Sequence, residues 1–128
     1  MAREVAPTAA EVLARQITMN VASWRALESN GVTTETELRL DFNYITASES
    51  SAQSLATLLR EETDYEVRVE AGKSGGFKRR NWFVSGRTQL TPVSPEILDQ
   101  WVTWMVAAGF QHGQCIFDGW GAMVPHKK

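Results

Sequence analysis

The sequence predicts a mixed α+β domain in which helices pack against an antiparallel sheet. Two kinds of hydrophobic period lead to this prediction: apolar residues recur every three or four residues in some segments and every second residue in others. A length of 128 residues with 43% hydrophobic content suits one domain with a sizeable core. We therefore expect a single globular unit, with an N-terminal helix within residues 1–30 and the main domain at residues 31–128.

The first helix is expected from about residue 8 to residue 28. Thr8 can accept hydrogen bonds from the free N–H groups of the first turn, and Glu11 follows three residues later, as in a capping box. Asn30 and Gly31 end the helix, because both tolerate a left-handed backbone. The apolar side chains expected to share its buried face are Leu13, Ile17, Val21, Trp24 and Leu27.

Alternating patterns predict the first two strands. Apolar and polar residues alternate over residues 37–45 and again over residues 65–70, so each strand has one buried and one wetter face. Between them, Ser48 or Ser50 can cap a second helix that runs to about Glu62. The apolar stripe of this helix consists of Leu55, Leu58 and Leu59.

A hairpin is expected to join the second and third strands. Residues 72–76 are rich in glycine and form its loop, and the third strand runs from Trp82 to about Leu90. Gly86 within this strand indicates a bulge.

The last helix has a clear start at residues 94–96, where a serine can cap the helix, a proline has its φ angle preset and a glutamate favours the positive end of the helix dipole. Gly109 is expected to end this helix, and a final strand follows at residues 114–124. The side chains expected on its buried face are Ile97, Trp101, Trp104, Met105 and Ala108.

Leaving the first helix aside, the predicted order is strand, helix, strand, strand, helix, strand. Two right-handed strand-helix-strand units interleaved in this way form a four-stranded antiparallel sheet with both helices on one face, which is the ferredoxin-like βαββαβ sandwich. The N-terminal helix is an addition, expected to cover an edge strand or part of the open sheet face.

Composition narrows the class of protein. The net charge of -2, from 15 acidic and 13 basic residues, creates no global field for nucleic acid or anionic membranes. Cys115 is the only cysteine, which excludes an internal disulfide and suits a reducing compartment. No signal peptide is recognisable, and no apolar run approaches the roughly 20 residues of a membrane span. We therefore expect a cytoplasmic protein that needs neither a membrane nor a cofactor.

Signatures of catalysis are weak. Residues 72–74 are similar to the end of a phosphate-binding P-loop, but Val67 stands where that motif needs its first glycine, and a strand follows instead of a helix. His112 and His126 have no partner at a metal-ligand spacing. Cys115 starts an apolar strand, as a buried structural residue would. We expect no catalytic site, no metal site and no enzyme activity.

A basic loop is the candidate nucleic-acid site. Its positive charges lie beside Phe77 and Trp82, a combination that can neutralise phosphates and stack bases. The other interpretation is a solvated hairpin whose charges keep a sheet edge soluble. The basic residues are Lys73, Lys78, Arg79 and Arg80.

The most distinctive segment is Phe117-Asp118-Gly119-Trp120-Gly121. Asp-Gly within a strand pattern indicates a bulge, and the two glycines leave room for the indole. In one interpretation Asp118 caps local N–H groups and Trp120 packs in the core. In the other, Phe117, Asp118 and Trp120 form an exposed patch that binds a protein partner. Both interpretations stay open at this point.

Residues 31–124 resemble the family of the regulator of ribonuclease E activity B, RraB. The resemblance rests on the D-G-W-G sequence at residues 118–121, supported by residues 41–42 and 64–67 and by the order of the elements. It implies a bacterial, ferredoxin-like, non-catalytic regulator that binds the C-terminal regulatory region of ribonuclease E and slows RNA turnover. Such regulators are strongly acidic with an acidic tail, whereas this chain ends in Lys127 and Lys128.

The expected function is therefore protein binding that modulates RNA decay, through ribonuclease E or a related enzyme. The alternative is a single-stranded nucleic-acid-binding domain that uses residues 73–80. Formation of a homo-oligomer stays open, because an uncovered sheet face or edge can also meet a second copy.

Overall fold

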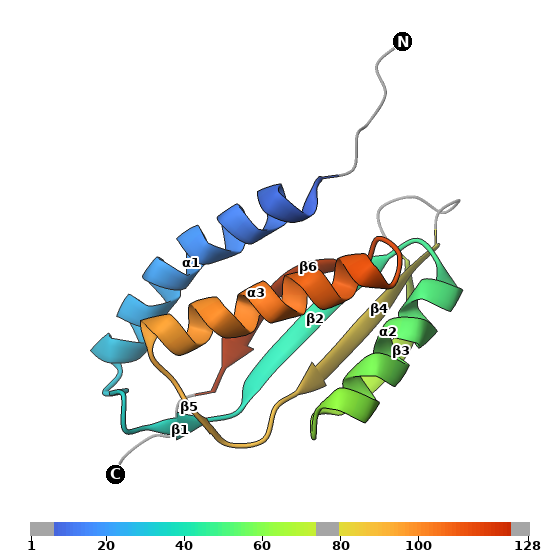
Figure 1. The fold of residues 1–128 in the computed structure, drawn as a ribbon. Coiled ribbons are helices and arrows are strands. Elements are labelled where there is room, and N and C mark those ends of the chain that lie inside the picture. Colours follow the sequence, from blue (N-terminus) through green and yellow to red (C-terminus); the bar gives the residue numbers. More distant parts are fainter. Residues whose placement is uncertain (1–6, 74–79, 124–128) are drawn as a thin grey trace.

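The computed structural model describes residues 7–73 and 80–123 and has a mixed α+β architecture (Figure 1). In the described part of the chain, three helices accompany a four-stranded antiparallel sheet and a short two-stranded one. The elements in chain order are α1 (Ala9–Ser29), β1 (Glu37–Leu38), β2 (Leu40–Thr46), α2 (Glu49–Glu62), β3 (Glu66–Lys73), β4 (Arg80–Arg87), β5 (Thr91–Pro92), α3 (Pro95–Gln111) and β6 (Ile116–Ala122).

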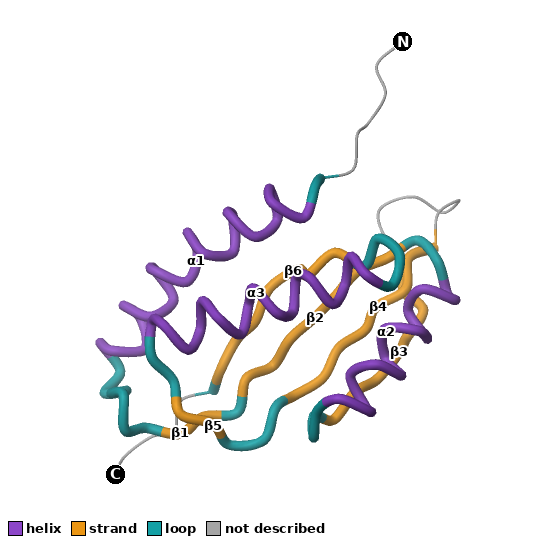
Figure 2. The backbone as a smooth tube through the Cα atoms, in the orientation of Figure 1, coloured by secondary structure: helices purple, strands orange, loops and turns teal. Residues whose placement is uncertain are grey.

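The main sheet has the strand order β3-β4-β2-β6, and every neighbouring pair is antiparallel. The helix α2 connects β2 to β3, and α3 lies between β4 and β6 in the chain. Figures 1 and 2 show both helices on the same face of the sheet, with the added helix α1 beside α3. The strands β1 and β5 pair separately at one end of the molecule.

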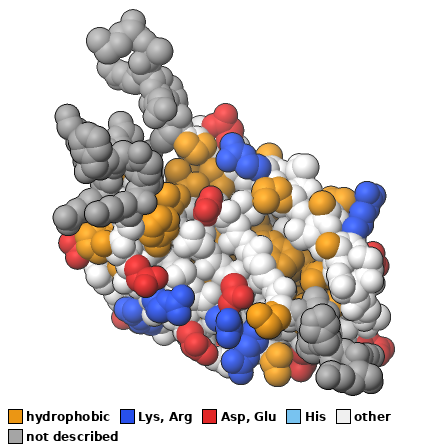
Figure 3. Space-filling view, turned by 180° about the vertical axis from the view of Figure 1, so that it is seen from behind, with side chains coloured by type: hydrophobic (Ala, Val, Ile, Leu, Met, Phe, Trp, Pro, Cys, Tyr) orange, Lys and Arg blue, Asp and Glu red, His pale blue; other side chains and the backbone are white. Residues whose placement is uncertain are grey.

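The opposite face of the sheet carries charged and apolar side chains mixed together, as Figure 3 shows from behind. On this face Arg87 of β4 pairs with Asp41 of β2 at 2.7 Å. The β3 residues that share this face are Glu66, Arg68 and Glu70. This face is therefore not a surface of one charge sign.

The core lies between the helices and the inner face of the sheet. The burial of β2 alternates along its whole length, which confirms the predicted two-faced strand. Tyr44 is fully buried, and its hydroxyl donates to the carbonyl oxygen of Met105 at 2.7 Å. Burial also raises the pKa of Tyr44 well above its ordinary value, so this hydroxyl stays protonated as a donor.

The predicted helix starts are confirmed. Thr8 and Glu11 form the reciprocal capping box of α1. Ser48 caps α2 by accepting from the backbone N–H of Ser51, and Ser94 caps α3 in the same way. These signals are local, because a side-chain oxygen satisfies N–H groups only two or three residues away.

The predicted apolar faces of α1 and α3 are partly wrong. In α1, Val21 is 53% exposed, whereas Gln16 and Asn20 are only 4% and 3% exposed. Their amides are buried because they find hydrogen-bond partners on β6 and α3. In α3, Ile97 and Trp104 are 38% and 41% exposed, so the buried face is narrower than the apolar pattern.

Two glycines have different roles from those predicted. Gly109 does not end α3, which continues to Gln111; a Cβ atom at Gly109 would overlap the carbonyl oxygen of Cys115 on the neighbouring chain segment. Gly86 does not form a bulge, because β4 pairs in regular register on both sides. A Cβ atom at Gly86 would overlap the carbonyl oxygen of Glu66. Both glycines therefore allow close approach of two backbones.

Gly109→Ala is expected to lower the free energy of unfolding by about 1–3 kcal/mol, although alanine favours a helix by about 1 kcal/mol. The added methyl group would force α3 away from Cys115, and urea denaturation would measure the loss. Gly121→Ala is the control, because no described atom lies within 4 Å of a Cβ atom there. Equal stability of the two variants would contradict the close approach at Gly109.

Candidate binding site

The distinctive D-G-W-G segment lies in β6 and contains the predicted bulge. Gly119 pairs with Asn43 of β2 and Phe117 pairs with Tyr44, so Asp118 is an extra residue between two paired positions. Gly119 has a φ angle of 134°, which favours glycine. The bulge is thus confirmed, and its extra residue brings Phe117 and Trp120, three positions apart, onto the same face of the sheet.

Phe117 and Trp120 face the helices. Phe117 is 1% exposed, and its ring meets the ring of Trp101 edge-on at 6.0 Å. Trp120 is half-buried, and its indole N–H donates to Oδ1 of Asn20 at 2.8 Å. The amide nitrogen of Asn20 then donates to Oδ1 of Asp99 at 2.9 Å. Trp120 is thus held between the sheet, α1 and α3.

Of the three predicted contact residues, Asp118 alone is exposed. Within the described part of the chain, no hydrogen bond to its carboxylate is present. The three side chains therefore do not form one patch: Phe117 belongs to the core, Trp120 packs beneath α1, and Asp118 remains a predicted contact.

The predicted nucleic-acid site is only partly covered by the structure. Lys78 and Arg79 lie outside the described residues, as does His126. The backbones of Lys73 and Arg80 form the last pair between β3 and β4. Binding of nucleic acid by this basic loop stays a prediction.

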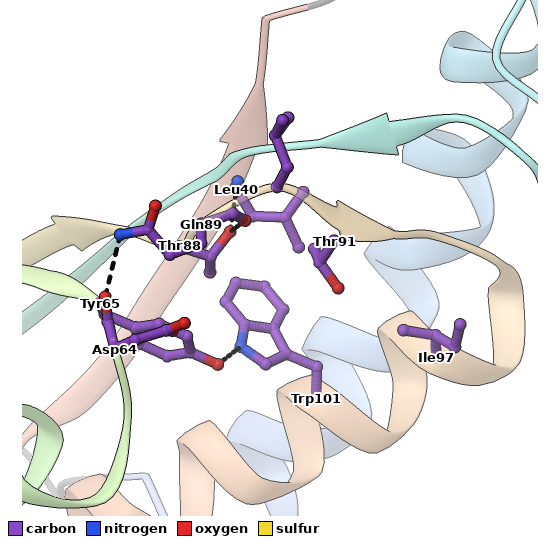
Figure 4. Close-up of a pocket in the computed structure, with 9 residues that line it drawn as sticks. Leu40, Asp64, Tyr65, Thr88, Gln89, Thr91, Ile97 and Trp101 are labelled. Carbon is purple, nitrogen blue, oxygen red and sulfur yellow. Dashed lines mark hydrogen bonds between the residues drawn. The ribbon is translucent and has the colours of Figure 1, made fainter.

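The structure also contains a pocket that the sequence did not indicate, of about 200 Å³, at the end of the sheet near the start of α3 (Figure 4). Leu40 of β2 and Trp101 of α3 contribute apolar walls. Tyr65 lies at the entry to β3, and the chain after β4 adds Thr88 and Gln89. Four separate elements or connections thus converge on this pocket.

Two hydrogen bonds connect the walls of the pocket. The indole N–H of Trp101 donates to the Tyr65 hydroxyl at 3.0 Å, which joins α3 to the entry of β3. The side-chain amide of Gln89 donates to the carbonyl oxygen of Asp64 at 3.0 Å. Figure 4 shows both hydrogen bonds among the residues that line the pocket. These bonds join segments that are 25 and 36 residues apart in the chain.

Large apolar side chains surround the pocket at the surface. Leu90 is 59% exposed and Ile97 is 38% exposed, and both line the pocket. Ile97, Trp101 and Trp104 are spaced four and three residues apart, so they share one flank of α3. We call Leu90, Ile97, Trp101 and Trp104 the apolar stripe. The sequence pattern predicted that Ile97, Trp101 and Trp104 lie on the buried face of this helix. The only sign of a surface stripe was that the helix has more apolar residues than one buried face requires.

The residues weighed for catalysis lie elsewhere. Cys115 is fully buried, and burial raises the pKa of its thiol, which disfavours the reactive thiolate. His112 follows α3, and its Nδ1 atom lies 2.6 Å from the hydroxyl of Ser54 on α2. Within residues 7–73 and 80–123, no group of three His, Cys, Asp or Glu side chains is arranged to hold a metal. No helix in these ranges has the length and apolar character needed to cross a membrane.

Comparison with known proteins assigns no family to the chain. No protein-family model matches it, and a search of curated proteins finds no match either.

Proposed function

We propose that this chain is a non-catalytic protein-binding module and that its partner docks on the apolar stripe. The supporting observation is the exposure of Leu90 and Ile97, at 59% and 38%, at one pocket, together with the 41% exposure of Trp104 on the flank of α3 that carries Ile97. Exposed apolar side chains that gather on one side of a protein mark interaction sites, and tryptophan is among the residues that most often dominate their energetics.

The proposed fold is the ferredoxin-like sandwich. The strand order β3-β4-β2-β6 and the positions of α2 and α3 on one face support it. In this proposal α1 is the added helix, and it covers the flank of α3 that faces away from the apolar stripe. The fold itself selects no function, so the functional proposal depends on the surface.

The proposed partner is an RNA-degrading enzyme of the ribonuclease E kind in the bacterial cytoplasm, whose activity the module restrains. This choice comes from the resemblance to RraB at residues 118–121 and from the order of the elements. Asp118 is exposed on the β6 bulge and is proposed as a second contact.

Trp104→Gln is expected to reduce capture of the RNA-degrading enzyme from the cell of origin by tenfold or more, because a central interface tryptophan often contributes about 2 kcal/mol. Affinity purification with quantitative mass spectrometry would measure this. Met19→Gln is the matched control, because Met19 is a large apolar residue on α1 that is 48% exposed, outside the stripe.

Each result decides a separate part of the proposal. If Trp104→Gln and Met19→Gln capture the enzyme as well as the unmodified chain does, the apolar stripe is not the docking surface. If no RNA-degrading enzyme is enriched by any form, the proposed class of partner is wrong.

A further inference from the structure

We infer that the pocket receives one large apolar side chain of a protein partner, and that a lysine or arginine next to that side chain contacts Asp64. This inference rests on the proposed function and specifies the chemistry of the docking segment. The partner segment would be short and extended, with a leucine-like residue followed or preceded by a basic one.

The size of the pocket favours a single side chain. Its volume of about 200 Å³ is below the roughly 300–1,000 Å³ of sites that enclose drug-sized ligands. Leu40, Ile97 and Trp101 present apolar groups to its interior. An apolar group that enters would remove these surfaces and its own from water, which is favourable by about 25 cal/mol per Å².

The charge at the mouth favours a basic neighbour. Among the described residues that line the pocket, Asp64 carries the only formal charge. Glu61 and Glu62 lie three and two residues before it in the chain, and all three residues are exposed. A cation beside the inserted side chain would be attracted to the Asp64 carboxylate, whereas an anion there would be repelled.

Tyr65 supplies a donor for the backbone of the partner. Its hydroxyl oxygen accepts from Trp101, and no described residue accepts its proton. Burial raises the pKa of Tyr65, so the hydroxyl keeps this proton at neutral pH. A carbonyl group of an extended segment could therefore accept a hydrogen bond at the pocket wall, which would orient the inserted side chain.

Two blocked dipeptides test the inference by NMR on the full chain: N-acetyl-leucyl-lysine amide and N-acetyl-leucyl-glutamate amide. The reporter is the indole N–H signal of Trp101, which is assigned by its loss in Trp101→Phe. It reports directly on the pocket because this N–H donates a hydrogen bond to the hydroxyl of Tyr65 in the pocket wall. We expect the lysine dipeptide to shift this signal and to bind about fivefold more tightly than the glutamate dipeptide. The difference should shrink as salt is added.

Asp64→Asn is expected to bring the two affinities within about twofold of each other, since it removes the charge and little else. Glu49→Gln removes a charge at the other end of α2 and should leave the fivefold preference in place. If neither dipeptide moves the Trp101 signal, the pocket does not bind apolar side chains. If both bind equally, or if the preference survives in Asp64→Asn, the predicted basic neighbour is wrong. The Trp104→Gln capture result is independent of both outcomes, so the proposed function is tested separately.

Discussion

Replacing Phe117 with alanine is expected to lower the free energy of unfolding by about 3–5 kcal/mol. The side chain is 1% exposed and contacts two other rings edge-on, Tyr44 at 5.3 Å and Trp101 at 6.0 Å. Truncation removes the buried ring and leaves a cavity between β6, β2 and α3, which the surrounding helices can fill only in part. A loss of this size is a large fraction of the stability of an ordinary domain, about 5–15 kcal/mol.

The adjacent residue is the natural control for this prediction. Asp118 is exposed on the bulge, so Asp118→Ala should change the stability little. Urea denaturation of both variants would measure the midpoints, with an unchanged slope as the sign of an unchanged unfolded state. Equal midpoints would mean that the Phe117 ring is not a core element. If Asp118→Ala leaves the stability unchanged, any effect it has on capture of the RNA-degrading enzyme cannot come from folding. The variant therefore also tests whether the exposed carboxylate contacts the partner.

Local signals in the sequence predicted the elements well. The capping serines and threonine mark helix starts because they satisfy N–H groups within the same turn. The alternation in β2 predicted its buried face because a pleated strand turns successive side chains to opposite sides. The Asp118-Gly119 pair predicted the bulge for an equally local reason, since glycine adopts a positive φ angle without strain.

The sequence could not predict which flank of a helix is covered. An apolar pattern assigns Ile97 and Trp104 to a core, but whether another element covers them depends on where α1 and α2 lie on the sheet. The sequence could not predict the pocket either, because Tyr65 and Trp101 are 36 residues apart and meet only in the folded chain. Basic residues 78 and 79 lie outside the described part of the chain, so the prediction that the basic loop binds nucleic acid still rests on the sequence.

The burial of polar residues on α1 is the clearest example of a feature that depends on tertiary contacts and that the apolar pattern does not predict. Asn20 is 3% exposed, and its side-chain amide forms one hydrogen bond as acceptor and one as donor. The indole N–H of Trp120 donates to its oxygen, and its nitrogen donates to the Asp99 carboxylate. A carboxamide can serve both groups at once, because it carries an acceptor and a donor side by side. The apolar pattern omits Asn20, yet this side chain fixes Trp120 beneath α1.

Asn20→Leu is therefore expected to lower the free energy of unfolding by about 1–3 kcal/mol, although leucine has a similar size and favours the helix. The loss arises because the Trp120 N–H and the Asp99 carboxylate, both partly buried, lose their hydrogen-bond partner. In the double variant with Trp120→Phe the indole N–H is absent, so Asn20→Leu should cost at least 1 kcal/mol less there.

Asn20→Asp distinguishes the hydrogen bond with Trp120 from the hydrogen bond with Asp99. Its carboxylate can still accept from Trp120, but it would face the carboxylate of Asp99 at the distance of the present hydrogen bond. Two close carboxylates bind a proton more readily in the folded chain than in the unfolded one, so the variant is expected to lose more stability, relative to the unmodified chain, at pH 7 than at pH 4. Urea denaturation at both pH values would measure the two differences. For Asn20→Asp, a loss of stability that is the same at pH 4 and pH 7 would show that Asp99 does not face residue 20. For the double variant, additive effects of Asn20→Leu and Trp120→Phe would show that the Asn20 amide does not hold the Trp120 indole.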